Sequence, residues 1–185
     1  MTFPHDHKQA LRAKMRAERD RFAASNQMVI MPPRALLTRL KPGLIVASYH
    51  PIGAEADPSH LHMAAHDAGA RLALPHVTGK ATPMRFLAWH PDHDLAEGPF
   101  GLRQPLGDEE LAPDIILTPL IAFDRDLNRL GQGAGHYDRA FAQYPRAWRL
   151  GVAWSVQQTD SLPSDSWDIP LHAIVTERAY LEKED

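Results

Sequence analysis

The chain has 185 residues, of which 44% are hydrophobic and 23% charged, and its formal net charge at pH 7 is -3. These values are typical of a globular protein with a core of useful size, and the acidic balance argues against a general nucleic-acid binder. The sequence contains no cysteine, which excludes disulfides, thiol nucleophiles and cysteine-ligated metals. We expect a single domain over residues 1–185.

No apolar run approaches the roughly 20 residues of a membrane-spanning helix. Residues 1–12, MTFPHDHKQALR, lack the apolar core of a signal peptide. We therefore expect a cytoplasmic protein that binds neither membranes nor nucleic acid, and no pattern in the chain indicates an obligate protein partner.

The first predicted element is a helix over residues 6–24. Leu11, Met15 and Phe22 form its apolar stripe. Basic residues recur at spacings of four and three, so they share a second face: Lys8, Arg12, Arg16 and Arg19. Such a charge run is most often a solvated face, and the spacing alone does not decide between solvent and a ligand.

Residues 34–40 predict a short second helix. Residues 44–49, LIVASY, form a near-continuous apolar run, which is typical of a buried strand. Asp57 and Pro58 are favourable at a helix start, so a third helix is expected from there to about residue 68.

The remaining strands are predicted at five places. They are residues 71–75, 84–89, 115–122, 149–154 and 173–176. The first of them follows a strand and a helix, and such β-α-β units imply parallel pairing. Residues 90–113 are polar and rich in proline, and we expect them to be irregular. The pattern as a whole indicates an α/β domain with a mostly parallel sheet.

Glu55 follows the first predicted strand. Ligands of open α/β sheets bind beyond the carboxyl ends of the strands, which makes this carboxylate a candidate binding group. The alternative is an exposed loop carboxylate without a ligand.

The most informative stretch is LTPLIAFDRDLNRLGQGAGHYDRAFAQY, residues 117–144. An apolar run leads through a polar turn to three alternate glycines and then to a predicted helix over residues 135–143. Backbone amides of such a loop, together with a helix N-terminus, can hold an anion. The spacing matches neither GxxxxGK[ST] nor GxGxxG. A glycine-rich turn without a ligand is the alternative.

The segment RLGQGAGHYDR, preceded by TPLIAFD, resembles the signature of the 5-formyltetrahydrofolate cyclo-ligase family. The resemblance extends over nearly the whole chain. It includes KxxxR in the first helix, PxxxE ending at Glu55, GxAxxxQ starting at Gly151, and the later LP and TE pairs. The chain departs from the family pattern at Ala134, His136, Gln104 and Trp167, where glycine, an aromatic residue, glutamate and histidine are frequent.

The resemblance implies a three-layer Rossmann-like fold and a ligase that forms a ring. The expected reaction is the ATP- and Mg²⁺-dependent cyclisation of 5-formyltetrahydrofolate to 5,10-methenyltetrahydrofolate, with ADP and phosphate released after phosphorylation of the formyl oxygen. Two other functions stay open: a folate-binding protein of this fold without turnover, and an ATP-independent phosphosugar isomerase or acyl-transfer relative.

The resemblance also implies site residues. Those expected to bind ATP are Lys8, Arg12, Arg129, Gly131, Gln132, Gly133, Ala134, Gly135, His136 and Tyr137. Those expected to bind the folate are His50, Glu55, Gly133, Ala134, Gly135, His136 and Tyr137. Arg129 and Tyr137 are the expected catalytic residues, and Asp138 and Asp168 the expected magnesium ligands. From its position alone, Asp138 is equally well interpreted as a first-turn acid that complements the helix dipole.

Histidines invite a second metal hypothesis. His62 and His66 stand four residues apart on a predicted helix, but the sequence HMAAH lacks the glutamate of HExxH, so a hydrolytic zinc site is not favoured. A polar cluster at residues 90–94 is expected to be solvated.

Overall fold

The computed structural model describes residues 4–183, with side chains from residue 7 onward. Its centre is a seven-stranded sheet of order β11-β10-β9-β6-β1-β2-β3. The strands are β1 (Ile45–Ala47), β2 (Arg71–His76), β3 (Arg85–Trp89), β6 (Ile115–Pro119), β9 (Trp148–Val152), β10 (Ala173–Val175) and β11 (Tyr180–Glu182). Pairings from β10 to β2 are parallel, and only the edge strands β3 and β11 are antiparallel. The predicted α/β class is confirmed.

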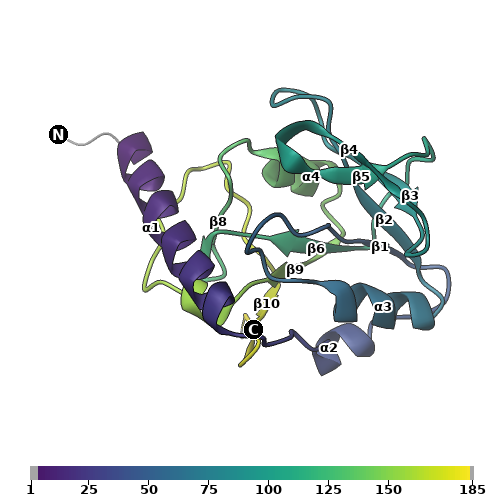
Figure 1. Ribbon diagram of the computed structural model, residues 1–185, viewed down its shortest axis with the longest axis horizontal. Helices are drawn as coiled ribbons and strands as arrows, with labels where there is room; N and C mark the ends of the chain where they lie inside the picture. Colours follow the sequence, from purple (N-terminus) through teal and green to yellow (C-terminus); the bar gives the residue numbers. More distant parts are fainter. Residues whose placement is uncertain (1–3, 184–185) are drawn as a thin grey trace.

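Helices cover both faces of the sheet, which gives the expected three layers. They are α1 (Pro4–Ser25), α2 (Arg34–Leu37), α3 (Ser59–Asp67) and α4 (His136–Gln143). Side chains alternate between faces along a strand. Val46 therefore packs in a cluster with residues of α2 and α3, whereas Ala47 packs in a second cluster with Phe141 of α4. Figure 1 shows α3 and α4 on opposite sides of the strands.

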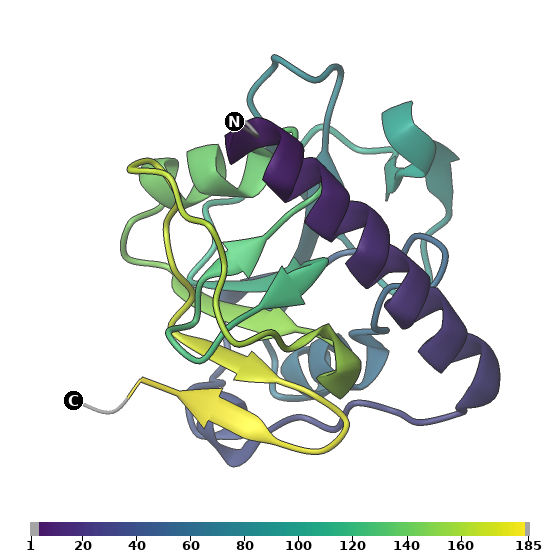
Figure 2. The same ribbon diagram turned by 90° about the vertical axis from the view of Figure 1, so that its left-hand side faces the viewer.

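Helix α1 belongs to neither layer. It lies across the carboxyl ends of the parallel strands, as Figure 2 shows. Met15, on the predicted apolar stripe, is buried against Ile121, Ala122 and Leu130 in a small third cluster. The basic face of the helix is thereby turned along the loops that follow the strands.

The predicted single strand over residues 115–122 is wrong, because the apolar run divides. Strand β6 ends at Pro119, and β7 (Ala122–Phe123) pairs antiparallel with β8 (Arg129–Leu130). The side-chain amide of Gln157 donates hydrogen bonds to the carbonyl oxygens of Leu120 (2.7 Å) and Ile121 (3.1 Å). These bonds replace sheet pairing at the break.

Residues 90–113 are less irregular than expected. They contain the antiparallel pair β4 (Leu95–Glu97) and β5 (Arg103–Pro105), with a 3₁₀ turn, η1 (Pro99–Gly101), between them. Gln104 fastens this pair to β2, because its buried side-chain oxygen accepts a hydrogen bond from the amide of Val77 at 3.1 Å. Over residues 4–183, no helix has the length and apolar character needed to cross a membrane.

Candidate active site

The order of the sheet reverses at β1. The chain passes from β1 to β2 on one side, whereas β6 pairs with the other side of β1. Loops that follow two such strands diverge and leave a crevice at the carboxyl ends, which is where open α/β sheets bind ligands. A cavity of about 1430 Å³ opens at this point, walled by both loops, by α1 and by residues 165–169.

Every site residue expected from the sequence lines this cavity. The set comprises Lys8, Arg12, His50, Glu55, Arg129, Gly131, Gln132, Gly133, Ala134, Gly135, His136, Tyr137, Asp138 and Asp168. They come from four separate parts of the chain, so only the fold brings them together. Their individual roles toward ligands stay predictions.

The glycine loop follows β8 and ends at the start of α4. Gly133 and Gly135 have φ of +101° and +68°, a region that favours glycine because a Cβ is strained there. Gly135 precedes the first turn of α4 and has no side chain to cap its amides. These amides therefore stay available to an anion at the helix N-terminus.

Arg139 and Arg12 hold the loop in shape. The guanidinium of Arg139 lies 3.0 Å from both the carbonyl oxygen of Ala134 and Nδ1 of His136. The Nε of Arg12 donates to the carbonyl oxygen of Gly131 at 2.8 Å. Burial, followed by the nearby charge of Arg139, lowers the pKa of His136, which favours a neutral imidazole at the loop.

Lys8 bridges α1 to the segment before β10. Its Nζ lies 2.6 Å from Oδ2 of Asp165 and 2.8 Å from Oδ2 of Asp168. Partial burial acts to lower the pKa of Lys8, but the hydrogen bonds to the two carboxylates outweigh it, and the net shift is upward. Asp165 is a site residue that sequence reasoning missed. Its backbone amide donates to Asp168 at 2.8 Å, and the D-x-x-D spacing was the available signal.

Arg129 and Asp138 form a second ion pair, with 2.7 Å between Nη2 and Oδ1. The Arg129 side chain is only 5% exposed, and its guanidinium carbon lies 5.7 Å from the ring centroid of Tyr137 and 5.3 Å from that of Phe141. Such stacking orients the planar cation.

Asp138 and Asp168 were the expected metal ligands. The amide of Ile169 lies 3.5 Å from Oδ1 of Asp138, so the segment that carries Asp168 touches Asp138. Two hard carboxylates beside a phosphate-type loop fit Mg²⁺, which commonly takes one or two carboxylates and completes its shell with water and phosphate oxygens. Among residues 7–183, no group of three acidic or histidine ligands stands ready-made.

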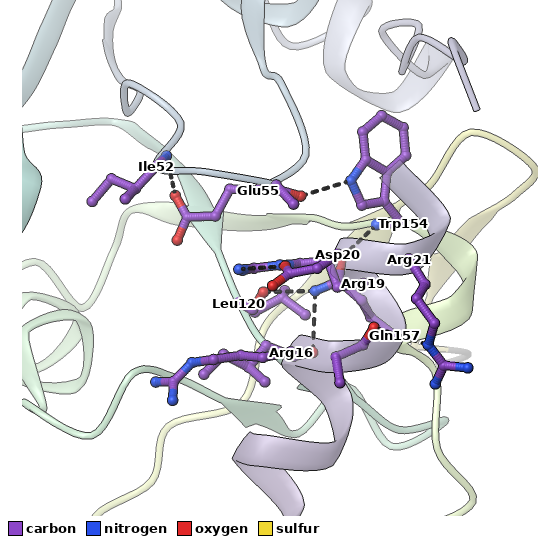
Figure 3. A network of polar contacts seen from close by, with 12 residues as sticks. Arg16, Arg19, Asp20, Arg21, Ile52, Glu55, Leu120, Trp154 and Gln157 are labelled. Carbon is purple, nitrogen blue, oxygen red and sulfur yellow. Dashed lines mark hydrogen bonds and ion pairs between the residues drawn. The ribbon is translucent and has the colours of Figure 1, made fainter. Parts of the chain in front are cut away.

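Glu55 lines the cavity from the loop that follows β1 and is 9% exposed. One oxygen accepts from the amide of Ile52 at 3.0 Å, and the other accepts from the side-chain amide of Gln132 at 3.2 Å. Figure 3 shows the short turn that orients this carboxylate. The indole nitrogen of Trp154 stabilises the turn by donating a hydrogen bond to the carbonyl oxygen of Ala54. Burial raises the pKa of Glu55, because desolvation disfavours the charged form.

Two further arginines of α1 lie behind this carboxylate (Figure 3). Arg16 Nη2 donates to the side-chain oxygen of Gln132 at 2.6 Å, so it reaches Glu55 through Gln132. Arg19 is 6% exposed, and its charge acts to lower the pKa of Glu55 against the larger effect of burial. The spacing of the basic residues indicated their common face but not which of them turns inward.

Tyr137 lines the cavity near both Arg129 and Glu55, whose charges act in opposite directions on its pKa. Burial, followed by the charge of Glu55, raises the pKa of Tyr137, so its phenol keeps its proton over the physiological range. A protonated phenol can donate a hydrogen bond to a polar ligand in the cavity.

Comparisons with known proteins agree with one family. The model of the 5-formyltetrahydrofolate cyclo-ligase family matches residues 4–177. The chain is 32% identical over 161 residues to the 5-formyltetrahydrofolate cyclo-ligase of Escherichia coli (strain K12), covering 83% of this chain and 85% of that protein. It is 38% identical over 97 residues to the Haemophilus influenzae protein of the same name, covering 49% of this chain and 52% of that protein.

A solved structure agrees with the same family. The NMR structure of Aquifex aeolicus 5,10-methenyltetrahydrofolate synthetase superposes with a TM-score of 0.74 at 31% identity, covering 96% of this chain and 93% of that chain. The alignment therefore includes the sheet, α1 and the segments that wall the cavity.

Proposed function

Because the chain belongs to the 5-formyltetrahydrofolate cyclo-ligase family, we propose that it uses ATP to close 5-formyltetrahydrofolate into 5,10-methenyltetrahydrofolate, releasing ADP and phosphate. The observation that carries the proposal is one cavity with two chemically different walls. One wall has cations and a glycine loop at a helix N-terminus, and the other has a buried carboxylate.

The cationic wall suits the triphosphate. Lys8, Arg12 and Arg129 come from two elements and face the cavity together with the loop amides. Phosphoryl transfer needs positioning and charge neutralisation more than covalent help from the protein, and this wall offers both.

The carboxylate wall suits the pterin. A pterin presents neighbouring N–H groups on its aminopyrimidinone edge, and a carboxylate can accept two parallel hydrogen bonds from them. Glu55 is held by Ile52 and Gln132, so it is oriented before any ligand binds. His50 precedes Glu55 in the same loop and lines the same cavity.

The reaction proceeds in two substitutions. The formyl oxygen attacks the γ-phosphorus, the bond to ADP breaks, and the formyl carbon becomes electrophilic. The neighbouring side-arm nitrogen then attacks this carbon and loses its proton to solvent, and the carbon–oxygen bond breaks with release of phosphate. Arg129 balances the charge of the transferring group, and the Tyr137 phenol donates a hydrogen bond where the two substrates meet.

Asp138 and Asp168 would hold Mg²⁺, which supplies charge neutralisation between phosphate oxygens. In the described structure these carboxylates are paired with Arg129 and Lys8. When the nucleotide binds, Lys8 and Arg129 would be able to pair with phosphate oxygens, and Asp138 and Asp168 would then be available to hold the ion.

The test is the appearance of methenyltetrahydrofolate, followed by absorbance, on mixing the protein with 5-formyltetrahydrofolate, ATP and Mg²⁺. We expect product only when all three are present. Asp138→Asn should abolish the signal, whereas Asp160→Asn, which changes an exposed acid outside the cavity, should leave it intact. Folate binding without product would favour a binding protein, and no ATP binding would refute the assignment of the loop.

A further inference from the structure

Trp167 is a large aromatic side chain that lines the active-site cavity and yet is 69% exposed. The other three tryptophans of the chain, Trp89, Trp148 and Trp154, are buried or half-buried. Single exposed apolar side chains are common on protein surfaces. One that lines a cavity lies where a ligand can cover it, so the indole of Trp167 is a candidate binding surface.

Trp167 stands in the centre of a β-turn whose two ends are fixed. The amide of Asp168 donates to the carbonyl oxygen of Asp165 at 3.0 Å, and the amide of Asp165 donates to Oδ2 of Asp168 at 2.8 Å. Lys8 of α1 bonds to both carboxylates. Central turn positions usually carry glycine, asparagine, aspartate or serine, so an indole is unusual here. Because the backbone is already fixed, a ligand that covers the ring has little ordering cost to offset.

The turn belongs to the cationic wall of the cavity. Figure 2 shows the segment before β10 beside α4 and the first turns of α1, where Lys8 meets it. Helix α1 reaches Glu55 at a different place, through Arg16 and its bond to Gln132. Lys8 and Arg16 are eight residues apart, which corresponds to about 12 Å along a helix. The turn and the folate carboxylate are thus separated along α1.

The chemistry sets the direction in which a nucleotide lies in this cavity. In the proposed reaction, on which this assignment depends, the γ-phosphorus meets the formyl group of a folate held at Glu55. The γ-phosphate therefore points toward Glu55, and the nucleoside end of ATP extends away from it. On the cationic wall that direction leads past Lys8 and Asp168 to the turn. We propose that the indole of Trp167 stacks on the base of the bound nucleotide.

Stacking on an aromatic side chain accounts for a defined part of the affinity. Its scale is about 5- to 100-fold per base, and it does not select among bases, since every base has an aromatic face. Inorganic tripolyphosphate carries the phosphates of ATP but has no base. The stack therefore strengthens binding of ATP and leaves binding of tripolyphosphate unchanged.

The experiment is calorimetric titration of the full chain with ATP, and separately with sodium tripolyphosphate, in excess Mg²⁺ and without folate. Trp167→Ser should weaken ATP binding by about tenfold, with the affinity for tripolyphosphate unchanged. Trp167→Phe keeps an aromatic face and should retain most of the ATP affinity. ATP should also quench the tryptophan fluorescence of the parent chain, and this quenching should be lost in Trp167→Phe.

Leu106→Ser is the matched control, because Leu106 is also a large exposed apolar residue, at 72%, and lies outside the cavity. It should bind both ligands as the parent chain does. Equal ATP affinity in Trp167→Ser and Leu106→Ser would overturn the stack. Equal weakening of ATP and tripolyphosphate would also overturn it, since Trp167 would then act through the turn and not through the base.

A failure of the proposed function would give a different result. If the parent chain binds no ATP, both the assignment of the glycine loop and the stack are refuted. If the parent chain binds ATP and Trp167→Ser binds it equally well, the stack alone is refuted and the cyclo-ligase reaction stands untouched.

Discussion

The two walls of the active-site cavity handle charge in opposite ways. On the cationic wall two of the three cations are already paired with a carboxylate, Lys8 with Asp168 and Arg129 with Asp138. On the carboxylate wall Glu55 is buried and accepts hydrogen bonds from neutral donors only. Paired charges can change partners at small cost, whereas a desolvated carboxylate gains most from a ligand that supplies donors. The first wall can thus exchange its ion-pair partners for a charged ligand, and the second favours a ligand that donates hydrogen bonds.

Removing Arg129 from the cationic wall should have the largest effect. We expect Arg129→Met to lower kcat by about 10²–10³, the scale for losing one donor to developing charge. The folding cost should also be large, about 3–5 kcal/mol, because the pair is mostly buried, at 5% and 21% exposure, and Asp138 would be left without its partner. Steady-state kinetics and urea unfolding measure the two effects. Arg125→Met, at an exposed loop position outside the cavity, should change neither.

Glu55→Gln tests the other wall. Loss of a charge-assisted pair of hydrogen bonds should raise KM for the folate by about tenfold or more, with KM for ATP unchanged. An equal rise in both constants would show that the two walls are not separate. Unchanged folate affinity would remove Glu55 from the folate site.

The same variant gives a pH test of stability. Burial raises the pKa of Glu55 above its ordinary value of 4.5, so the folded protein holds this proton more tightly than the unfolded chain. Wild-type stability from this group is therefore greatest at low pH and falls as pH rises through the raised pKa. Glutamine stays neutral, so the stability of Glu55→Gln relative to wild type should increase as the pH rises through the raised pKa. At or below the ordinary pKa, the variant should show no such increase. Urea unfolding at several pH values measures the difference.

Gly133→Ala should have a smaller effect on function, limited to the cationic wall. A Cβ at a φ of +101° costs about 1–2 kcal/mol, and it would lie 3.4 Å from the guanidinium carbon of Arg12. We expect lower stability and weaker ATP binding, with folate affinity retained. Gly107→Ala is the control, because no atom lies within 4 Å of that Cβ and its φ is not positive.

The smallest expected effect is that of Asp165→Asn. Lys8 keeps its bond to Asp168 at 2.8 Å, and Asp165 is 35% exposed, so the lost pair contributes only about 0.5 kcal/mol. Thermal unfolding and KM for ATP should both change little. A loss of activity as large as that of Asp168→Asn would mean that Asp165 is itself a metal ligand.

The sequence located most elements of the sheet, but not the break within one apolar run nor the last edge strand. The buried run at residues 44–49 and the glycine loop before α4 lie where periodicity placed them. The break between β6 and β7 escaped prediction because its carbonyls are satisfied by Gln157, which is 36 or 37 residues away along the chain. Strand β11 escaped because YLE carries no apolar run, and its stability comes from pairing with β10.

The site residues were predicted from two different sources. A local motif indicated the loop residues, and the family resemblance added Lys8, Glu55 and Asp168. What no local pattern could supply is which side chains neutralise one another. The D-x-x-D spacing indicates Asp165 as a candidate, but nothing local indicates its pairing with Lys8, which is 157 residues away in the chain.

The contacts of α1 have a consequence for how the chain assembles. Lys8 meets Asp165 and Asp168 across sequence separations of 157 and 160 residues, and Arg12 meets Gly131 across 119. During synthesis from the N-terminus, the first helix emerges long before its docking surface exists. Contacts of such high sequence separation form late, since closing long loops is entropically costly. Helix α1 is thus made well before the segments on which it docks, and the active site is completed only when it meets residues 131 and 165–168.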